Sequence, residues 1–140
     1  MQTMNIGRLA ELARVNIDTI RYYERQGLLP PATRSASGYR KYSQGDLERL
    51  HFILRSKDLG FTLAEIGELL SLTSGRESDM HGVKQKAEQR LAQVEQKIAE
   101  LQRVRRGLRK LIEVCPGKGE LASCPIVAAL NGKQNRGDAR

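Results

Sequence analysis

The stretch Asn5-Ile-Gly-Arg-Leu-Ala-Glu-Leu-Ala-Arg-Val-Asn-Ile-Asp-Thr-Ile-Arg-Tyr-Tyr-Glu-Arg25 decides the fold of the N-terminal third of this chain. Its apolar residues recur at helical spacing over residues 5–14 and predict a first short helix. Residues 15–17 form a brief turn, and Thr19 to Arg25 predicts a second helix that ends at Gly27. Two short helices joined by a tight turn predict a helix-turn-helix, although any helical hairpin would fit the same pattern.

The next segment carries the signals of a short β-hairpin, or wing. Pro30 and Pro31 keep the preceding residues out of the helical region, so the chain leaves the second helix in extended form. Ser37-Gly38 is a turn signal. We expect the two flanking arginines, Arg34 and Arg40, to face outward from this wing.

Two further helices and a hinge follow the wing. Ser43 is a good N-cap for a helix over 44–59, which Gly60 would end. Thr62 is expected to cap the next helix. Residues 72–78 contain Thr, Ser and Gly and predict a hinge.

Residues 79–114 predict one long helix whose apolar residues form a heptad seam. Thirty-six helical residues would extend roughly 54 Å, which a domain of this size cannot cover. We therefore expect the seam to pair with a second copy in a two-stranded coiled coil of identical subunits. The direction is left open, and a helix packed within its own chain is the alternative. The seam consists of Leu91, Val94, Ile98, Leu101, Arg105, Leu108 and Ile112.

The composition narrows the class of protein. The formal net charge is +8, and residues 1–57 hold ten Lys or Arg against five Asp or Glu, which favours a polyanionic partner over a merely solvated basic surface. No signal peptide and no apolar run of roughly 20 residues is present, so we expect a cytoplasmic protein without membrane contact. The sequence also lacks a Gly-rich phosphate loop and a nucleophile with a recognisable partner, so we expect no enzyme.

Cys115 and Cys124 are the only cysteines of the chain. Eight residues separate them, two of these are glycines, and a proline follows each cysteine, so a short loop can bring both sulfurs to one point. Two thiolates suit a soft cation that accepts linear coordination. A disulfide or a pair of idle thiols is the alternative, and a disulfide is disfavoured in the cytosol. Residues 125–130 predict a short helix that covers the loop, and residues 131–140 a disordered tail.

Three motifs together resemble the MerR family of bacterial metal- and drug-responsive transcription regulators. They are Ile6-Gly-Arg-Leu-Ala, Thr19-Ile-Arg-Tyr-Tyr-Glu-Arg-Gln-Gly-Leu-Leu29, and Arg34 followed by Tyr39-Arg40-x-Tyr42. The resemblance implies an all-α fold with a small β wing. It places a winged helix-turn-helix with linking helices at 1–74, an antiparallel dimerisation helix at 79–114 and a metal-binding loop with a short helix at 115–130.

The resemblance also implies a mechanism and partners. Dimers of this family sit on double-stranded promoter DNA with an over-long spacer and repress it without inducer. With inducer bound they distort the DNA and activate transcription by RNA polymerase. The expected function is therefore that of a homodimeric activator of metal efflux or resistance genes.

The expected DNA-facing residues follow from chemistry and from the resemblance. Side chains near the start of the second helix can reach base edges or phosphates, and Asp18 or Asn16 is also expected to cap that helix. The wing and the following helix would hold flanking phosphates, whereas Tyr23 is expected in the core. The expected DNA-binding set is Asn16, Asp18, Thr19, Arg21, Tyr22, Arg34, Tyr39, Arg40 and Lys57.

The metal prediction is Cu(I), or Ag(I) or Au(I), held by Cys115 and Cys124, as in the copper-efflux regulators that the loop resembles, though this loop is one residue longer. Family sensors of divalent ions place a third cysteine at the start of the dimerisation helix. The family's sensors of monovalent ions have a small neutral residue there. Met80 aligns to that position here, so it departs from both kinds, and it cannot supply a third thiolate. We expect three accessory residues beside the site, Met80, His81 and the partner subunit's Lys84. Met80 is expected to pack over the ion, with a role as a weak soft third ligand as the alternative, and Lys84 is one of several groups able to offset the negative charge of the centre.

Two alternatives remain open for the sensing loop. A divalent sensor of Zn, Cd, Hg or Pb would use Cys115, Cys124 and His81, although an isolated exposed histidine is usually just solvated. A thiol or redox sensor would use the cysteines as a dithiol, although they lack the C-x-x-C spacing and an activating base.

Overall fold

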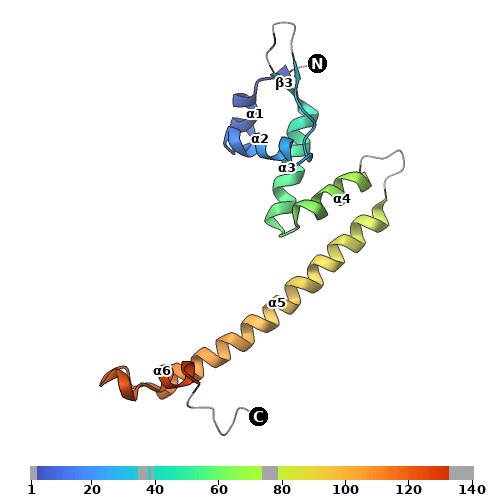
Figure 1. The fold of residues 1–140 in the computed structure, drawn as a ribbon. Coiled ribbons are helices and arrows are strands. Elements are labelled where there is room, and N and C mark those ends of the chain that lie inside the picture. The colour runs from blue at the N-terminus through green and yellow to red at the C-terminus, as the bar shows by residue number, and fades with distance from the viewer. Residues whose placement is uncertain (1–2, 35–37, 39, 74–78, 133–140) are drawn as a thin grey trace. The chain divides into compact units, whose positions relative to one another are not determined.

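The computed structural model describes residues 3–34, 38, 40–73 and 79–132. The chain divides into two compact units, residues 1–90 and 91–140. The first unit is helical with a small antiparallel sheet (Figure 1). Its helices are α1 (Ile6–Ala13), α2 (Ile17–Arg25), α3 (Gln44–Asp58) and α4 (Leu63–Thr73), followed by the start of the long helix α5 (Met80–Val114).

The predicted helix-turn-helix is confirmed, with one correction at the start of its second helix. The α2 helix begins at Ile17 rather than Thr19, because Asn16 is extended and its side chain accepts the Thr19 N–H at 2.8 Å. Asp18 therefore lies in the first turn and is not the cap. Arg14 closes α1 in the left-handed region at φ 60°, which turns the chain sharply into α2.

The wing belongs to a three-stranded antiparallel sheet rather than to an isolated hairpin. The strands β1 (Thr3–Met4), β2 (Thr33–Arg34) and β3 (Arg40–Ser43) lie in the order β1-β3-β2. Thr3 pairs with Ser43, and Arg34 pairs with Arg40. The β1 strand was not predicted, since two residues carry no periodicity. Most of the predicted turn, including Ser37 and Tyr39, lies outside the described residues.

One apolar core joins the helix-turn-helix, the sheet and helices α3 and α4. Tyr23 is buried in it, as expected, and so is Tyr42 of β3, whose exposed fraction is 2 %. Burial of each large aliphatic side chain contributes on the order of 2 kcal/mol of transfer free energy. The fully buried aliphatic residues are Leu9, Ile20, Leu50, Ile53 and Ile66.

Caps set the ends of α3 and α4. Ser43 and Asp46 form a reciprocal capping box at the start of α3, as their spacing predicted. Thr62 and Glu65 exchange the same pair of hydrogen bonds at the start of α4. Gly60 adopts φ +89° between the two helices, a conformation that strains any residue with a Cβ.

The first turns of α5 contact the rest of the first unit through an apolar contact, an ion pair and a hydrogen bond, among others. Val83 packs against the core, Lys86 pairs with Glu68 of α4 at 2.5 Å, and Arg90 Nε donates to the Leu59 carbonyl at 2.7 Å. The long helix was predicted, and these contacts hold its N-terminal turns against the first unit. The predicted hinge at 72–78 lies mostly outside the described residues, and its first two residues complete α4.

The second unit contains the rest of α5, a 3₁₀ turn η1 (Leu121–Ser123) and α6 (Pro125–Leu130). No residue of α5 is buried in the single chain. The predicted C-terminal helix is confirmed as α6, with Pro125 at its first position. The predicted tail lies outside the described residues beyond Gly132, and none of the described helices has the length and apolarity needed to cross a membrane.

Candidate functional site

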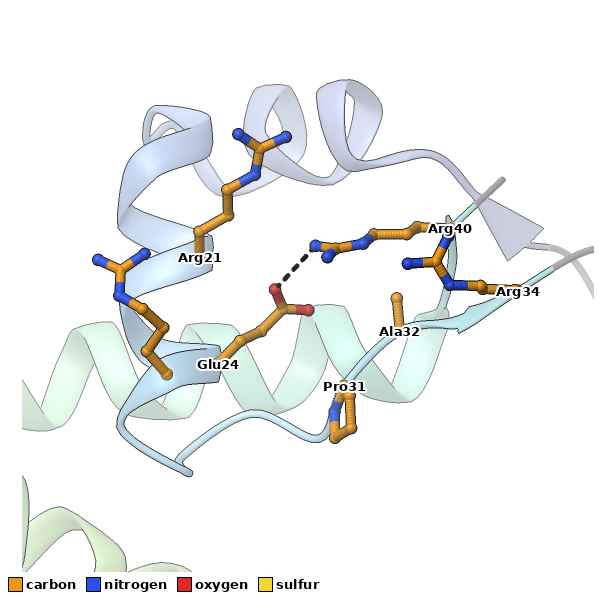
Figure 2. Close-up of a pocket in the computed structure, with 7 residues that line it drawn as sticks. Arg21, Glu24, Pro31, Ala32, Arg34 and Arg40 are labelled. Atoms are coloured by element: carbon orange, nitrogen blue, oxygen red, sulfur yellow. Dashed lines mark ion pairs between the residues drawn. The ribbon is translucent and has the colours of Figure 1, made fainter. Parts of the chain in front are cut away.

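A basic groove lies between α2 and the wing (Figure 2). Its volume is about 580 Å³. Four arginines and one carboxylate line it, so the groove carries a clear excess of positive charge and suits a polyanion. The lining residues are Arg21, Glu24, Arg25, Pro31, Ala32, Arg34 and Arg40.

Glu24 connects α2 to the wing. Its Oε2 accepts a hydrogen bond from the Tyr42 hydroxyl at 2.9 Å, and its Oε1 lies 3.6 Å from Arg40 Nη1. Figure 2 shows Arg40 reaching from the wing toward Glu24. Arg40 is exposed, as expected, and the Glu24 carboxylate attracts its guanidinium over the groove. Arg34 remains exposed, and its Nη1 donates to the Gly38 carbonyl at 3.0 Å.

The buried Tyr42 hydroxyl makes the stability of the first unit sensitive to alkaline pH. Burial and the hydrogen bond to Glu24 raise the pKa of Tyr42 to about 12, from about 10 in the unfolded chain. The neutral form is therefore favoured by folding, and its contribution is complete below pH 10. We expect that contribution, about 2 kcal/mol, to be lost as the pH rises from about 10 to about 12. Urea unfolding followed by circular dichroism across this range measures it.

Tyr42→Phe is the control for this pH dependence. The variant should lose stability at pH 8, and it should show a much smaller decline between pH 10 and 12. Some decline will remain because burial also raises the pKa of Tyr23. If the free energy of unfolding of Tyr42→Phe falls between pH 10 and 12 as steeply as that of the parent, the Tyr42 hydroxyl is not the titrating group.

Glu24→Gln tests the electrostatic role of the single carboxylate in the groove. The amide still accepts the Tyr42 hydrogen bond but no longer attracts Arg40 or repels phosphate. We expect random-sequence DNA to bind several-fold more tightly and log Kd to depend more steeply on log salt, because one more cation becomes available to phosphate. Fluorescence anisotropy at several salt concentrations measures both. Glu113→Gln, an exposed α5 carboxylate, is the matched control, and weaker binding of all DNA by Glu24→Gln would contradict the prediction.

The structure gathers part of the expected DNA-binding set into this groove and places the rest elsewhere. Arg21, Arg34 and Arg40 line it. The side chains of Asn16 and Thr19 bond to each other at 2.9 Å, which commits Asn16 to capping. The remaining expected residues, Asp18, Tyr22 and Lys57, are exposed on α2 and α3, while Tyr39 lies outside the described residues.

Two charged residues of the groove were missed from the sequence, Glu24 and Arg25. Arg25 follows Arg21 by four residues, so the helical spacing alone places both on one face. Its guanidinium carbon also lies 6.0 Å from the centre of the Tyr22 ring, an arrangement that holds both side chains at the surface. Glu24 gave no such signal, because its partners Arg40 and Tyr42 come from the wing.

The cysteine loop brings its two sulfurs together. The Sγ atoms of Cys115 and Cys124 lie 3.9 Å apart, both cysteines are free, and both are half-buried. Gly117 and Gly119 adopt φ +80° and +111°, which allows the loop to reverse within a few residues. The loop encloses a recess of about 260 Å³ with both cysteines in its wall. The expected convergence of the two thiols is therefore observed.

Local electrostatics favour the thiolate of Cys124. The backbone N–H of Val127, followed by that of Ile126 and the Cys115 thiol, lowers the pKa of Cys124, and partial desolvation opposes this effect. These two N–H groups belong to the first turn of α6, for which Cys124 is the N-cap residue. The start of α6 was one of the sources expected to stabilise negative charge at this loop.

The two sulfurs fit a soft two-coordinate ion. An ion bound at roughly 2.3 Å from each sulfur, the length of a zinc–thiolate bond, holds them at most about 4.6 Å apart, so only a small opening of the loop is needed. Within residues 3–34, 38, 40–73 and 79–132, no group of three or more His, Cys, Asp or Glu is placed to hold a metal. A single chain thus offers two thiolates and no third charged ligand among these residues.

The expected accessory residues Met80, His81 and Lys84 lie in the first turns of α5 and are exposed. Met80 is 85 % exposed, which is high for a methionine. These residues belong to the first unit and the cysteines to the second.

Comparison with known proteins places this chain in one family of regulators, through matches that cover most of its length. Residues 4–73 match the family described as MerR HTH family regulatory protein, and residues 47–111 match the one described as MerR, DNA binding. Three relatives are similar over most of their length. The mercuric resistance operon regulatory protein of Bacillus cereus is 42 % identical over 89 % of this chain and 95 % of its own. HmrR of Sinorhizobium medicae is 43 % identical over 91 % and 86 %, and CueR of Escherichia coli O6:H1 is 38 % identical over 92 % and 95 %.

Solved structures show the same likeness. The regulator PbrR691 of Ralstonia metallidurans in complex with lead(II) has a TM-score of 0.82 and 35 % identity, over 91 % of this chain and 98 % of its own. HiNmlR bound to promoter DNA has a TM-score of 0.58 and 27 % identity, over 74 % and 78 %. The winged helix-turn-helix and the long helix are therefore shared with regulators of this kind.

Proposed function

Since the chain belongs to the MerR family of helix-turn-helix transcription regulators, we propose that it activates promoters of metal efflux or resistance genes in response to Cu(I), Ag(I) or Au(I). The observation that carries the choice of metal is the pair of sulfurs 3.9 Å apart, with no third charged ligand among the described residues. Two thiolates satisfy a soft monovalent ion, whereas Zn²⁺ requires four ligands.

The DNA-binding step uses the first unit. In the proposed complex α2 enters the major groove, where Arg21 and Tyr22 reach base edges or phosphates. Arg34 and Arg40 hold flanking phosphates from the wing, and the Glu24 carboxylate competes with phosphate for Arg40. HiNmlR, the relative bound to promoter DNA, supports this arrangement through its similar fold.

The dimer is proposed from the apolar face of α5. Its leucines and isoleucines are about half exposed in the single chain, for example Leu91 at 56 % and Ile112 at 65 %. A row of exposed large aliphatic residues at heptad spacing requires a partner helix in water. We propose that the partner is a second copy and that the dimer presents two α2 helices to successive turns of promoter DNA, where RNA polymerase binds.

The sensing step uses the cysteine loop. Cys115 and Cys124 hold the ion as thiolates, and the first-turn N–H groups of α6 offset the remaining negative charge. When bound, the ion links the end of α5 to α6 through these two sulfurs. Because α5 is continuous and its base is attached to α3 and α4, a change at the loop can bias the DNA-binding unit along this helix.

Transcription in vitro from a promoter that the protein binds tests the proposal. Purified protein is supplied with RNA polymerase and with Cu⁺, Ag⁺, Zn²⁺, Hg²⁺ or Pb²⁺ in separate reactions under reducing conditions. We expect activation by Cu⁺ and Ag⁺ and none by Zn²⁺. Activation by Zn²⁺ but not Cu⁺ would overturn the choice of metal.

A divalent sensor is the second candidate, because similar proteins include a mercuric resistance regulator and a lead(II)-bound regulator. In that case the two thiolates would need a further ligand, such as His81 of the partner subunit. Activation by Hg²⁺ or Pb²⁺ alone would favour it. Activation by oxidant without any metal would instead support a thiol sensor.

A further inference from the structure

An arginine interrupts the apolar seam of α5, and its position selects how two copies can pair. Arg105 occupies a core position of the heptad between Leu101 and Leu108. Its side chain is exposed and has no ion-pair partner among the described residues, and neither has that of Glu95. A charge in such a seam must find an opposite charge when the seam is covered.

The surface of α5 already has the shape that receives a partner side chain. A recess of about 260 Å³ is lined by Ile98, Leu101, Gln102 and Arg105. The spacing of these residues, three, four and seven apart from Ile98, is that of the four-residue hole which accepts one knob in a coiled coil. The recess therefore marks the helix face that a second helix covers, and Arg105 forms one of its walls.

Parallel pairing conflicts with this arginine. In a parallel dimer each seam residue faces the same residue of the partner subunit, so two Arg105 guanidinium groups would meet in the interface. Like charges in direct opposition are destabilising, and no carboxylate on the seam would separate them.

Antiparallel pairing has one alignment that satisfies the seam. In it, Leu91 faces the partner subunit's Leu108, and Ile98 faces the partner subunit's Leu101. Arg105 then faces the partner subunit's Val94, and Glu95 forms a wall of the hole that Arg105 enters. Sliding one helix by a heptad in one direction places Arg105 against the partner subunit's Leu101, so that the two Arg105 residues lie in adjacent layers on either side of the two-fold axis. Sliding it in the other direction places Leu108 against the partner subunit's Lys84.

We propose that Arg105 sets the register of the antiparallel dimer through an ion pair with the partner subunit's Glu95. The two-fold symmetry makes this pair twice, once on each side of the central contact between Ile98 and Leu101. The proposal deepens the dimer proposed above and rests on it. The apolar residues of the seam stabilise the dimer, and the buried ion pair selects one register of the two helices over the others.

A charge swap tests the ion pair in the full-length chain. We expect Arg105→Glu and Glu95→Arg each to raise the dimer dissociation constant roughly tenfold and the double variant to recover most of that loss. Sedimentation equilibrium measures the constants. Arg106→Glu, one residue away on the solvent side of the helix, is the matched control and should change the constant by less than about twofold. Single variants without effect, or a double variant no better than either single one, would overturn the pair.

Cross-linking tests the register separately. In a Cys115→Ser/Cys124→Ser background, chains carrying L91C are mixed with chains carrying L108C and oxidised. We expect disulfide-linked dimers in this mixture and few in mixtures of L91C with L101C or of I98C with L108C, which report the two displaced registers. Cross-linking of L108C to itself would indicate a parallel dimer and overturn the register. A chain that remains monomeric in sedimentation overturns the dimer itself, whereas a dimer linked in another mixture overturns the register alone.

Discussion

Cys115→Ser is expected to abolish activation by Cu⁺ while leaving promoter binding by the metal-free protein unchanged. The substitution removes one of two sulfurs that lie 3.9 Å apart, and the described residues offer no charged third ligand to replace it. A single thiolate with a serine hydroxyl is a poor ligand set for a soft ion. Removing a residue that only orients a metal ligand lowers the affinity for the metal by about 10–100-fold. Removing a ligand itself should therefore lower the affinity for Cu⁺ by at least about a hundredfold. Competition with a Cu(I) chelator measures the affinity, and transcription in vitro measures activation.

Ser123→Ala is the matched control for this experiment. Ser123 adjoins Cys124, and its hydroxyl donates to the Glu120 carbonyl at 2.9 Å, so the variant alters the loop without touching either sulfur. It should bind Cu⁺ within a fewfold of the parent. Undiminished activation of Cys115→Ser would remove the loop from the mechanism, and equal losses in both variants would indicate that loop folding, not sulfur ligation, was disturbed.

Arg21→Ala is expected to weaken binding of a selected operator by roughly tenfold to a hundredfold. Arg21 is exposed on α2 and lines the basic groove beside the wing arginines. We place it on a base edge, so binding of random-sequence DNA should fall much less than binding of the operator. Fluorescence anisotropy with both DNAs, using an operator selected from a random pool, gives the two dissociation constants.

The salt dependence of the same measurement separates two roles for Arg21. A base contact leaves the slope of log Kd against log salt nearly unchanged, whereas a phosphate contact reduces it by about one. Arg106→Ala, an exposed arginine in the second unit, controls for the loss of one positive charge. Equal weakening on both DNAs together with a reduced slope would reassign Arg21 to the backbone.

The local elements were readable from the sequence because their causes are local. The Ser43–Asp46 capping box, the left-handed Gly60 and the helical Pro125–Leu130 each depend on residues within a few positions of one another. The same holds for the heptad seam of α5, since one helix face is set by spacing alone. The convergence of the cysteines also follows from a short loop with two glycines.

The predictions were wrong or incomplete where a structural feature depends on which of two neighbouring residues caps a helix, or on a residue far away in the sequence. The α2 helix begins at Ile17 rather than Thr19 because Asn16, one of the two candidate caps, is the residue with the extended backbone. The two-residue strand β1 forms only because β3 is available to pair with it. The position of Arg40 over the groove could not be predicted, because it depends on attraction by Glu24, sixteen residues earlier.

The amino-acid sequence by itself therefore determined the helix-turn-helix, the long helix with its exposed seam, and the two-thiol loop, since helical periodicity, caps and short loop closures are encoded by neighbouring residues. Only the tertiary structure decided that Glu24 joins Arg40 and Tyr42, that Arg25 completes a four-arginine groove, and that α5 is attached through Lys86 and Arg90. These pairings cross between elements. Their energies depend on distances that arise only after the core has packed, and no pattern along the chain records them.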